Sequence, residues 1–283
     1  MRWMVTGSKG MLGQDLVARL VADGHDVTAV DIDELDITDP AAVGRIQDIE
    51  VLVNCAAYTA VDAAEENEGF AFTLNAVGPQ LLARPARACG ARMVQLYTDY
   101  VFAGNATSPY AEDEVIAPLS AYGRTKAAGE WAVRSENPDH LIVRTAWLYG
   151  AGGACFPKTM ARLAAERDSL SVVADQVGQP TWTVDLADLI VRLVEGAAPA
   201  GTYHGTSSGE VSWHGFTQAI VATIGKDPAM VAPTTSDDFQ RPAPRPAYSV
   251  LSHDALAAEG VAPIGLWDER GREAAASVLN IDG

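Results

Sequence analysis

The stretch MVTGSKGMLGQDL, residues 4–16, decides the fold. It places Gly7, Gly10 and Gly13 in a GxxGxxG pattern between an apolar segment typical of a strand and a segment with helical periodicity. A tight glycine turn at this junction lets backbone N–H groups and the helix N-terminus face a pyrophosphate. Asp31 follows near the end of the next apolar segment, where it can accept a hydrogen bond from a ribose hydroxyl. The stretch therefore predicts a dinucleotide-binding β-α-β unit.

Apolar segments alternate with helical segments through the first half of the chain. The pattern predicts strands over 2–7, 25–32, 50–57, 91–102 and 140–150, and helices over 9–24, 40–49, 65–89 and 119–130. Pro40 follows the capping candidate Asp39, and Pro79 or Pro85 is expected to kink or split the third helix. Because the strands are apolar throughout, both faces of the sheet are expected to be covered. The order indicates an α/β fold with a doubly wound parallel sheet of the Rossmann type.

The alternation of long apolar strands and helices changes after Gly150 to shorter segments. Helices are predicted over 155–168, 184–196 and 213–225, with short strands over 170–175 and 201–204. We expect an NAD(P)-binding domain over residues 1–150, to which a strand and a helix return around 171–203. Residues 151–283 are expected to form mainly a smaller α/β substrate-binding part.

The chain has 283 residues and a net charge of −17, which argues against a nucleic-acid-binding or anionic-membrane surface. Its three cysteines are scattered without a CxxC pair and are expected to be reduced thiols in a cytoplasmic protein. We expect no signal peptide, and no apolar segment reaches the roughly 18 residues that a membrane span needs. No HExxH, Cys/His cluster or EF-hand spacing indicates a metal site. A monomer or homodimer is expected.

The stretch LSAYGRTKAAGE, residues 119–130, holds Tyr122 and Lys126 one helical turn apart. Tyrosine has an unperturbed pKa of about 10, and a neighbouring ammonium makes its anion easier to form. On spacing alone, a solvated helix face is the simpler interpretation. The upstream glycine turn favours a chemical role, as do Thr98 and Asp99 after the fourth strand, because doubly wound sheets bind ligands at the carboxyl ends of their strands. The Thr98 hydroxyl is then placed to hydrogen-bond a substrate carbonyl.

Several motifs occur in an order that resembles one enzyme family. They are the glycine turn, NCAAYTAVDAAE, TDYVFAG, YGRTK, RTAWLYG, DQVGQPTW and RPAPRPAYSVL. Over nearly the whole chain, the sequence resembles an extended short-chain dehydrogenase/reductase. The YxxxK element alone marks only that superfamily. TDYVFAG together with DQVGQPTW and RPAPRPAYSVL resembles, more narrowly, the dTDP-4-dehydrorhamnose reductase family, whose members reduce nucleotide-linked ketosugars.

The resemblance implies a catalytic set of Thr98, Tyr122 and Lys126. Tyr122 would protonate the carbonyl oxygen as hydride arrives from the nicotinamide of NADPH or NADH. Lys126 would lower the pKa of the phenol and hold the nicotinamide ribose, and Thr98 would orient the ketone. Asp31 favours NADH because a 2′-phosphate would be repelled, although Lys9 can compensate.

The resemblance also implies the binding residues for cofactor and substrate. For the cofactor they are Gly7, Gly10, Met11, Leu12, Gly13, Asp31, Asp36, Ile37, Ala56, Ala57, Tyr58 and Thr59, together with Tyr122 and Lys126. For the sugar-nucleotide substrate they are Thr98, Asp99, Tyr122, Trp147, Arg241 and Arg245. The two arginines suit a diphosphate because guanidinium groups bind phosphate oxygens bidentately. Trp147 as a core residue and the arginines as solvated side chains are the structural alternatives.

The implied activity is reduction of the keto group of a dTDP-4-keto-6-deoxysugar, in deoxysugar, rhamnose or antibiotic-sugar biosynthesis. A dihydrostreptose-type synthase that reduces a different carbonyl, and an NAD(P)-binding regulatory subunit without turnover, are the alternatives. A dehydratase or isomerase is less favoured, because Tyr100 stands where dehydratases carry an acid after Thr-Asp. Two departures from the family pattern are Tyr97, in place of serine, and Pro85. Tyr97 is expected to narrow the sugar pocket or to alter which ketone is preferred, and Pro85 to bend a helix locally.

Overall fold

The computed structural model describes residues 1–280, and its centre is a six-stranded parallel sheet in the order β10-β5-β4-β3-β1-β2. The strands are β1 (Arg2–Thr6), β2 (Asp26–Val30), β3 (Val51–Asn54), β4 (Arg92–Thr98), β5 (His140–Thr145) and β10 (Gly201–His204). All neighbouring strands of this sheet pair in parallel. The predicted doubly wound α/β fold is confirmed.

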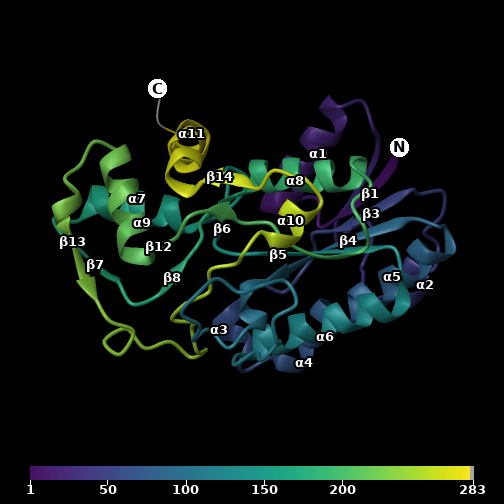
Figure 1. Ribbon diagram of the computed structural model, residues 1–283, viewed down its shortest axis with the longest axis horizontal. Coiled ribbons are helices and arrows are strands. Elements are labelled where there is room, and N and C mark those ends of the chain that lie inside the picture. The colour runs from purple at the N-terminus through teal and green to yellow at the C-terminus, as the bar shows by residue number, and fades with distance from the viewer. Residues whose placement is uncertain (281–283) are drawn as a thin grey trace.

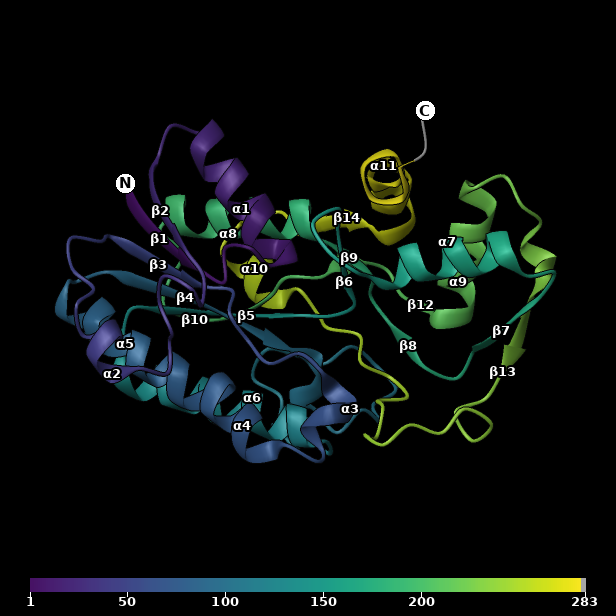
Figure 2. The ribbon, with the colours of Figure 1, turned by 180° about the vertical axis from the view of Figure 1, so that it is seen from behind.

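Helices cover both faces of the sheet, as Figures 1 and 2 show. One face carries α1 (Met11–Ala22) and α8 (Thr183–Glu195), and the other carries α2 (Pro40–Val43), α5 (Gly78–Ala88) and α6 (Ala121–Glu136). Large apolar side chains fill both layers, and burying each one contributes about 1.5–3 kcal/mol. Those of the first layer include Trp3, Leu16, Leu20, Leu189 and Ile190, and those of the second include Leu52, Leu82, Met93 and Val133. The edge strand β2 is the exception, since it stays partly exposed.

The predicted third helix, 65–89, is divided in the structure. It consists of α4 (Glu68–Phe72), a π-helical turn (Thr73–Val77) and α5, and it follows the short helix α3 (Val61–Ala64). Pro79 lies in the first turn of α5, and because proline has no N–H to donate, the regular helical ladder is interrupted just before it. Helix α5 continues through Pro85 to Ala88.

Several predicted strands are too long, and the two largest errors lie at the carboxyl edge of the sheet. Strand β4 ends at Thr98, and residues Asp99–Val101 form a 3-10 turn. The predicted strand 140–150 is interrupted before β6 (Leu148–Tyr149), because Trp147 has a φ of 48°. The chain therefore leaves the sheet at these points and turns towards the remaining, smaller part of the molecule.

The second half of the chain adds shorter elements beside the sheet. They are α7 (Phe156–Glu166), β7 (Leu170–Val173), β8 (Val177–Gly178), β9 (Thr181–Trp182), β11 (Ser207–Ser208), β12 (Val211–Ser212), α9 (Trp213–Thr223), a 3-10 turn (Pro228–Met230), β13 (Val231–Thr234), α10 (Asp254–Ala258), β14 (Ile264–Leu266) and α11 (Trp267–Leu279). Helix α8 and strand β10 return to the large sheet, whereas β7 pairs with β13 outside it. The assignment of separate binding domains stays a prediction.

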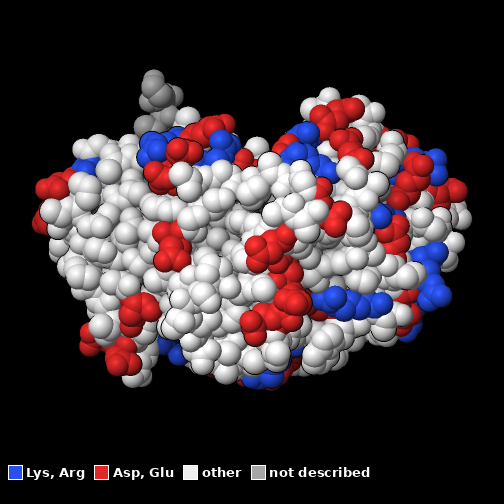
Figure 3. Space-filling model, in the orientation of Figure 1, with Lys and Arg blue, Asp and Glu red and all other residues white. Residues whose placement is uncertain are grey.

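Acidic side chains are spread over the face shown in Figure 3, and basic ones lie along its upper edge, including the part over α11, and on its right-hand side. Large uncharged areas separate the charged groups on this face. Among the described helices, none is both long and apolar enough to cross a membrane.

Candidate active site

The glycine turn between β1 and α1 packs so closely against backbone that two of its positions have no room for a side chain. Gly7 has a φ of +68°, and a Cβ atom there would lie 2.5 Å from the Ala56 backbone nitrogen. A Cβ atom at Gly13 would lie 2.2 Å from the Gly7 carbonyl oxygen. Helix α1 starts from Gly10, whose carbonyl accepts the Gln14 N–H at 3.0 Å. The N–H groups of the first turn therefore point out of the helix end, where they suit an anionic group.

A cavity of about 410 Å³ lies beside this turn, at the carboxyl ends of β1, β2 and β3. In a sheet of this order, the crevice between β1 and β3 is the expected ligand site. The predicted cofactor residues that line it are Gly7, Gly10, Asp31, Asp36, Ile37, Ala56 and Ala57. Lining residues that were not predicted are Lys9, Ile32, Leu35, Cys55 and Leu74. Only Leu74, on the π-helical turn, is remote in sequence from every predicted lining residue.

The other predicted cofactor residues do not line this cavity. The Leu12 side chain belongs to the core, and Met11 faces the turn at Gly150. The Tyr58 N–H donates to Asn75 Oδ1 at 2.8 Å, and Thr59 is exposed. The resemblance implies that Met11 and Leu12, in the first turn of α1, contact the pyrophosphate through backbone N–H groups, so that prediction does not depend on where their side chains lie.

The end of β2 carries a cluster of carboxylates around Lys9. Asp31 Oδ2 accepts the Lys9 backbone N–H at 2.8 Å. The Lys9 ammonium lies 2.9 Å from Asp33 and 3.2 Å from Glu34. The two carboxylates raise the pKa of Lys9. The pKa of Glu34 is lowered first by the Asp31 N–H, which donates to its Oε2 at 3.0 Å, and then by Lys9. One ammonium thus pairs with two carboxylates, and the Asp31 carboxylate lies beside them on the Lys9 backbone, so the local charge near the ribose position is negative.

Thr98 and Tyr122 meet at the carboxyl end of β4. The Thr98 hydroxyl donates to Asp99 Oδ1 at 2.9 Å and accepts the Tyr100 N–H at 3.2 Å. Tyr122 is 9% exposed, and its ring packs edge-on against Tyr100 with centroids 5.6 Å apart. Burial raises the pKa of the Tyr122 phenol, interaction with the Thr98 hydroxyl lowers it, and the Asp99 charge raises it further.

Lys126 lies one turn along α6, but its contacts differ from those implied by the resemblance. Its Nζ donates to the Leu96 carbonyl at 2.8 Å and lies 4.9 Å from the centre of the Tyr97 ring. Burial lowers the pKa of Lys126 to about 8, although Glu130 and Cys55 raise it. Lys126 is not among the groups that shift the pKa of the Tyr122 phenol in this structure. Cys55 lies near Lys126 and also lines the cavity, so the ammonium is close to the cofactor crevice.

Tyr97 does not take the position that the sequence suggested. Neighbouring residues of a strand point to opposite faces of a sheet, so Tyr97 and Thr98 diverge. The Tyr97 ring packs below Lys126, and its hydroxyl would lie 2.9 Å from a Cβ atom at Gly129 of α6. The expectation that this side chain narrows a sugar pocket is therefore wrong. The Tyr97 ring packs against the Lys126 ammonium instead.

The two predicted diphosphate ligands are engaged by a carboxylate of α3. Arg245 Nη2 donates to Asp62 Oδ1 at 2.9 Å, and Arg241 Nη1 lies 3.8 Å from Asp62 Oδ2. The Ala243 N–H also donates to Asp62, at 3.3 Å. The guanidinium of Arg245 lies 5.9 Å from the centre of the Tyr100 ring. The segment that carries both arginines therefore lies across the Tyr100 side of the site.

Trp147 lies between the sheet and the smaller part of the chain. Its ring stacks on Trp213 at the start of α9, with centroids 3.5 Å apart and planes 10° apart. A Cβ atom at Gly178 would lie 2.7 Å from the Trp147 ring. The partly exposed tryptophan thus packs against both parts of the chain.

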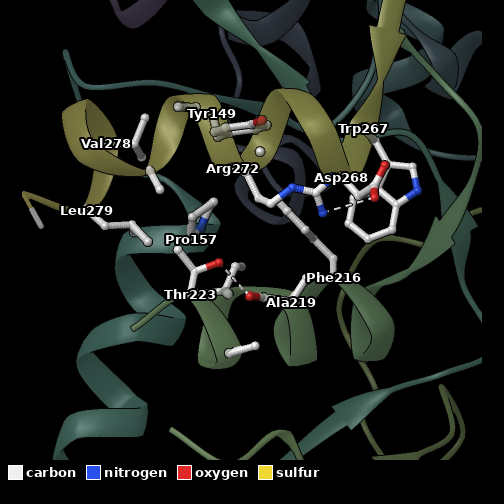
Figure 4. Close-up of a pocket in the computed structure, with 15 residues that line it drawn as sticks. Tyr149, Pro157, Phe216, Ala219, Thr223, Trp267, Asp268, Arg272, Val278 and Leu279 are labelled. Atoms are coloured by element: carbon white, nitrogen blue, oxygen red, sulfur yellow. Dashed lines mark hydrogen bonds and ion pairs between the residues drawn. The ribbon is translucent and has the colours of Figure 1, made fainter. Parts of the chain in front are cut away.

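A second cavity, of about 440 Å³, lies between α7, α9 and α11. Its lining is mostly apolar, as Figure 4 shows, with Phe216, Trp267 and Val278 among the labelled side chains. The Asp268–Arg272 ion pair of 3.2 Å lies at its edge. None of the predicted site residues lines it, so it is not the candidate active site. Within residues 1–280, no cluster of three or more His, Cys, Asp or Glu residues is arranged to hold a metal ion.

A dinucleotide crevice with a buried threonine, tyrosine and lysine at its sheet edge defines a short-chain dehydrogenase/reductase type of oxidoreductase. More narrowly, the chain belongs to the family described as "RmlD substrate binding domain", whose model matches residues 1–280. The predicted resemblance and the predicted enzyme class, an NAD(P)H-dependent oxidoreductase of the dTDP-4-dehydrorhamnose reductase type, are confirmed.

Similar proteins are known from several bacteria. The chain is 50% identical over 275 residues to a dTDP-4-dehydrorhamnose reductase of Streptomyces griseus, covering 94% of this chain and 90% of the relative. It is 47% identical over 270 residues to a dTDP-4-keto-6-deoxy-D-glucose reductase of Streptomyces niveus, covering 94% and 93%. A crystal structure of dTDP-4-dehydrorhamnose reductase from Bacillus anthracis in complex with NADP has a TM-score of 0.93 and 37% identity, covering 96% of this chain and 98% of that one.

Proposed function

We propose that this chain reduces the keto group of a dTDP-4-keto-6-deoxysugar with NADPH or NADH, and that Tyr122 is the proton donor. The observation that carries the proposal is the meeting of Tyr122 and Thr98 at the sheet edge that also bears the dinucleotide crevice. The names of the relatives support the substrate class, since both reduce sugars linked to dTDP. The NADP complex of the Bacillus anthracis relative supports the cofactor class.

The residues of the crevice fit a dinucleotide. A side chain at Gly7 or Gly13 would fill space that the turn leaves to backbone, and the first turn of α1 offers N–H groups to a pyrophosphate. Asp31 would hold the adenosine ribose, and Lys126 the nicotinamide ribose. When bound, the reduced nicotinamide supplies the hydride.

The chain's own residues would handle the proton. Thr98 would hold the ketone oxygen, and the Tyr122 hydroxyl would pass its proton to that oxygen as negative charge develops there. A phenol whose pKa is raised by burial is fully protonated at neutral pH, so it is ready to donate. When substrate binds, Arg241 and Arg245 would leave Asp62 and bind the diphosphate of the substrate. Each of its two phosphate groups can accept two hydrogen bonds from one guanidinium.

The test is an assay with dTDP-4-keto-6-deoxy-L-mannose and with NADPH or NADH, following the absorbance of the reduced cofactor. Product NMR with deuterated cofactor then shows which carbon gains the hydrogen, and so distinguishes 4-keto reduction from a dihydrostreptose-type reaction. Tight cofactor binding without oxidation of NADPH or NADH by any ketosugar nucleotide would defeat the proposal and favour a regulatory subunit.

A further inference from the structure

Asp99 carries a buried carboxyl group that the proposed mechanism leaves unused. It directly follows β4, is 2% exposed and begins the 3-10 turn. Its Oδ1 accepts the Thr98 hydroxyl at 2.9 Å, whereas its Oδ2 is buried and has no hydrogen-bond partner within residues 1–280. A buried, unpartnered carboxylate oxygen costs free energy, which protonation of the group relieves.

The hydroxyl of Thr98 connects this carboxyl to Tyr122. A threonine hydroxyl has one hydrogen to donate and two lone pairs to accept with. The hydrogen goes to Asp99, one lone pair accepts the Tyr100 N–H, and the other side faces the Tyr122 phenol. When Tyr122 has given its proton away, Thr98 can transfer its hydrogen to the phenolate only if it receives another from Asp99. The hydrogen bond between Asp99 Oδ1 and Thr98 Oγ1 then runs in the opposite direction, with the neutral carboxyl group as donor.

We propose that Asp99 is the proton source that restores Tyr122 after each turnover, acting through the hydroxyl of Thr98; this rests on the proposed function. The Asp99 carboxyl O–H bond breaks as its proton passes to Thr98 Oγ1, and the Thr98 hydrogen passes to the phenolate oxygen of Tyr122. The products are a neutral phenol, a neutral threonine and a carboxylate, which takes its next proton from water.

The surroundings of Asp99 favour a carboxyl that exchanges protons near neutral pH. Burial raises its pKa to about 6. The Ser249 hydroxyl, which approaches the carboxyl without forming a hydrogen bond to it, and the Thr98 hydroxyl hold the pKa down. The titratable groups facing it are Tyr122 from α6 and Tyr100 from its own turn, with Arg245 beyond Tyr100 on the C-terminal segment. Because burial holds the pKa of the Tyr122 phenol well above that of the Asp99 carboxyl, the proton is more stable on Tyr122, so loss of the phenol proton draws the carboxyl proton towards Tyr122.

The test compares the first turnover with continuous turnover in Asp99→Asn. In a single turnover, with enzyme in excess and NADPH or NADH bound, the phenol starts protonated, so the variant should lose much less rate here than under continuous turnover. Under continuous turnover it should be slower by tenfold or more, because its phenolate lacks the adjacent acid. Asp99→Glu should restore part of the lost rate. Asp113→Asn, which changes an exposed carboxylate, is the matched control and should leave both rates unchanged.

Two kinetic outcomes would overturn the role of Asp99. An equal slowing of both rates would mean that Asp99 acts on substrate binding or on Thr98 geometry. An unchanged rate of continuous turnover would mean that another group, such as Lys126, supplies the proton.

A measurement without substrate separates this inference from the proposed function. Infrared titration of the unliganded protein should show a carboxylic-acid C=O band near pH 6 that is present in the wild type and missing in Asp99→Asn. A carboxyl that stays ionised down to pH 4 would overturn the inference even if the reductase activity is present. Should the variant fail to fold, titration of the wild type with labelled aspartate gives the same answer.

Discussion

Tyr122 and its neighbours show how burial sets the chemistry of single residues. The phenol, the Lys126 ammonium and the Asp99 carboxyl are all nearly inaccessible, and burial is the largest cause of the pKa shift in each. In each case burial favours the neutral form. A tyrosine in that state donates a proton, which is the role that the YxxxK spacing suggested.

Tyr122→Phe should keep cofactor affinity within about threefold and lose about 10²–10⁴-fold in kcat, because only the proton donor is removed. Tyr100→Phe, which deletes the hydroxyl of the ring packed edge-on against Tyr122, is the matched control and should lose far less. Stopped-flow oxidation of the cofactor and equilibrium fluorescence measure the two quantities. Equal rates in Tyr122→Phe and the wild type would exclude this phenol as the donor.

Asp31→Asn should shift the cofactor preference towards NADPH. The variant removes one of three carboxylates around Lys9, and so reduces repulsion of a 2′-phosphate. We expect the ratio of kcat/KM for NADPH to that for NADH to rise about tenfold, which corresponds to about 1.4 kcal/mol. Glu50→Gln, a change to an exposed carboxylate before β3, should leave the ratio unaltered. A ratio that stays constant in Asp31→Asn would show that the preference is set elsewhere.

Helix α6 matters among the elements because it carries both Tyr122 and Lys126 against the sheet. Its approach to the π-helical turn depends on Gly129, where a Cβ atom would lie 2.1 Å from the Asn75 carbonyl oxygen. The π-helical turn was not predicted, since its cause is a proline acting together with this close packing. The helical character of both segments was predicted.

Gly129→Ala should destabilise the protein by about 1–3 kcal/mol, because backbone has to move to admit the methyl group. Gly69→Ala, in α4, is the matched control: nothing lies within 4 Å of its Cβ position. That variant should be neutral or stabilising by up to about 1 kcal/mol, since alanine favours a helix. Urea unfolding measures both, and equal stability of the two variants would contradict the packing argument.

Helix α3 and the segment around Arg245 form a contact between elements that are far apart in the sequence. Asp62→Ala removes the acceptor of the Ala243 N–H and the partner of both arginines. Because partly exposed ion pairs contribute up to about 1 kcal/mol, hydrogen exchange at Ala243 should become faster by up to about fivefold. Glu68→Ala breaks the Glu68–Arg124 pair instead and should leave that exchange rate as it is. Unchanged exchange in Asp62→Ala would show that the segment is held by other contacts.

For the molecule as a whole, stability depends on a buried polar network at the junction of β5, β10 and α6. Arg144 donates to both carboxylate oxygens of Glu130 at 2.8 Å, and both side chains are almost completely buried. His204 Nδ1 lies 2.9 Å from the Ser252 carbonyl, and its Nε2 lies 3.4 Å from Arg144 Nη1. A neutral imidazole with its proton on Nδ1 satisfies both contacts, so protonation would place a second cation beside Arg144.

His204 should make the protein less stable as the pH falls below 6.5. Burial, together with Arg144, lowers its pKa from 6.5 to about 3. In that window the unfolded chain binds a proton that the folded protein does not, so the contribution is complete above pH 6.5 and is lost on acidification. The unfolding free energy of the wild type relative to His204→Gln should fall by about 2 kcal/mol between pH 7 and pH 5. A difference that stays constant with pH would contradict the assignment.

Local patterns were sufficient for much of this protein. The glycine turn, the apolar strands and the Tyr122–Lys126 spacing are properties of short segments, because strand, turn and helix preferences depend on near neighbours. They led to the sheet, the family and the residues around the crevice. Strand ends were predicted less well, since Trp147 leaves the strand pattern to pack against Trp213.

Other features required the folded chain. The pairing of Arg245 with Asp62, the position of Tyr97 below Lys126 and the approach of Ser249 to Asp99 join segments that only the return of the chain brings together. The same holds for burial, which no short segment determines because it depends on every element packed around a group. The sequence therefore determines which side chains are available for catalysis. Their charge states and partners depend on burial and on contacts that only the folded chain provides.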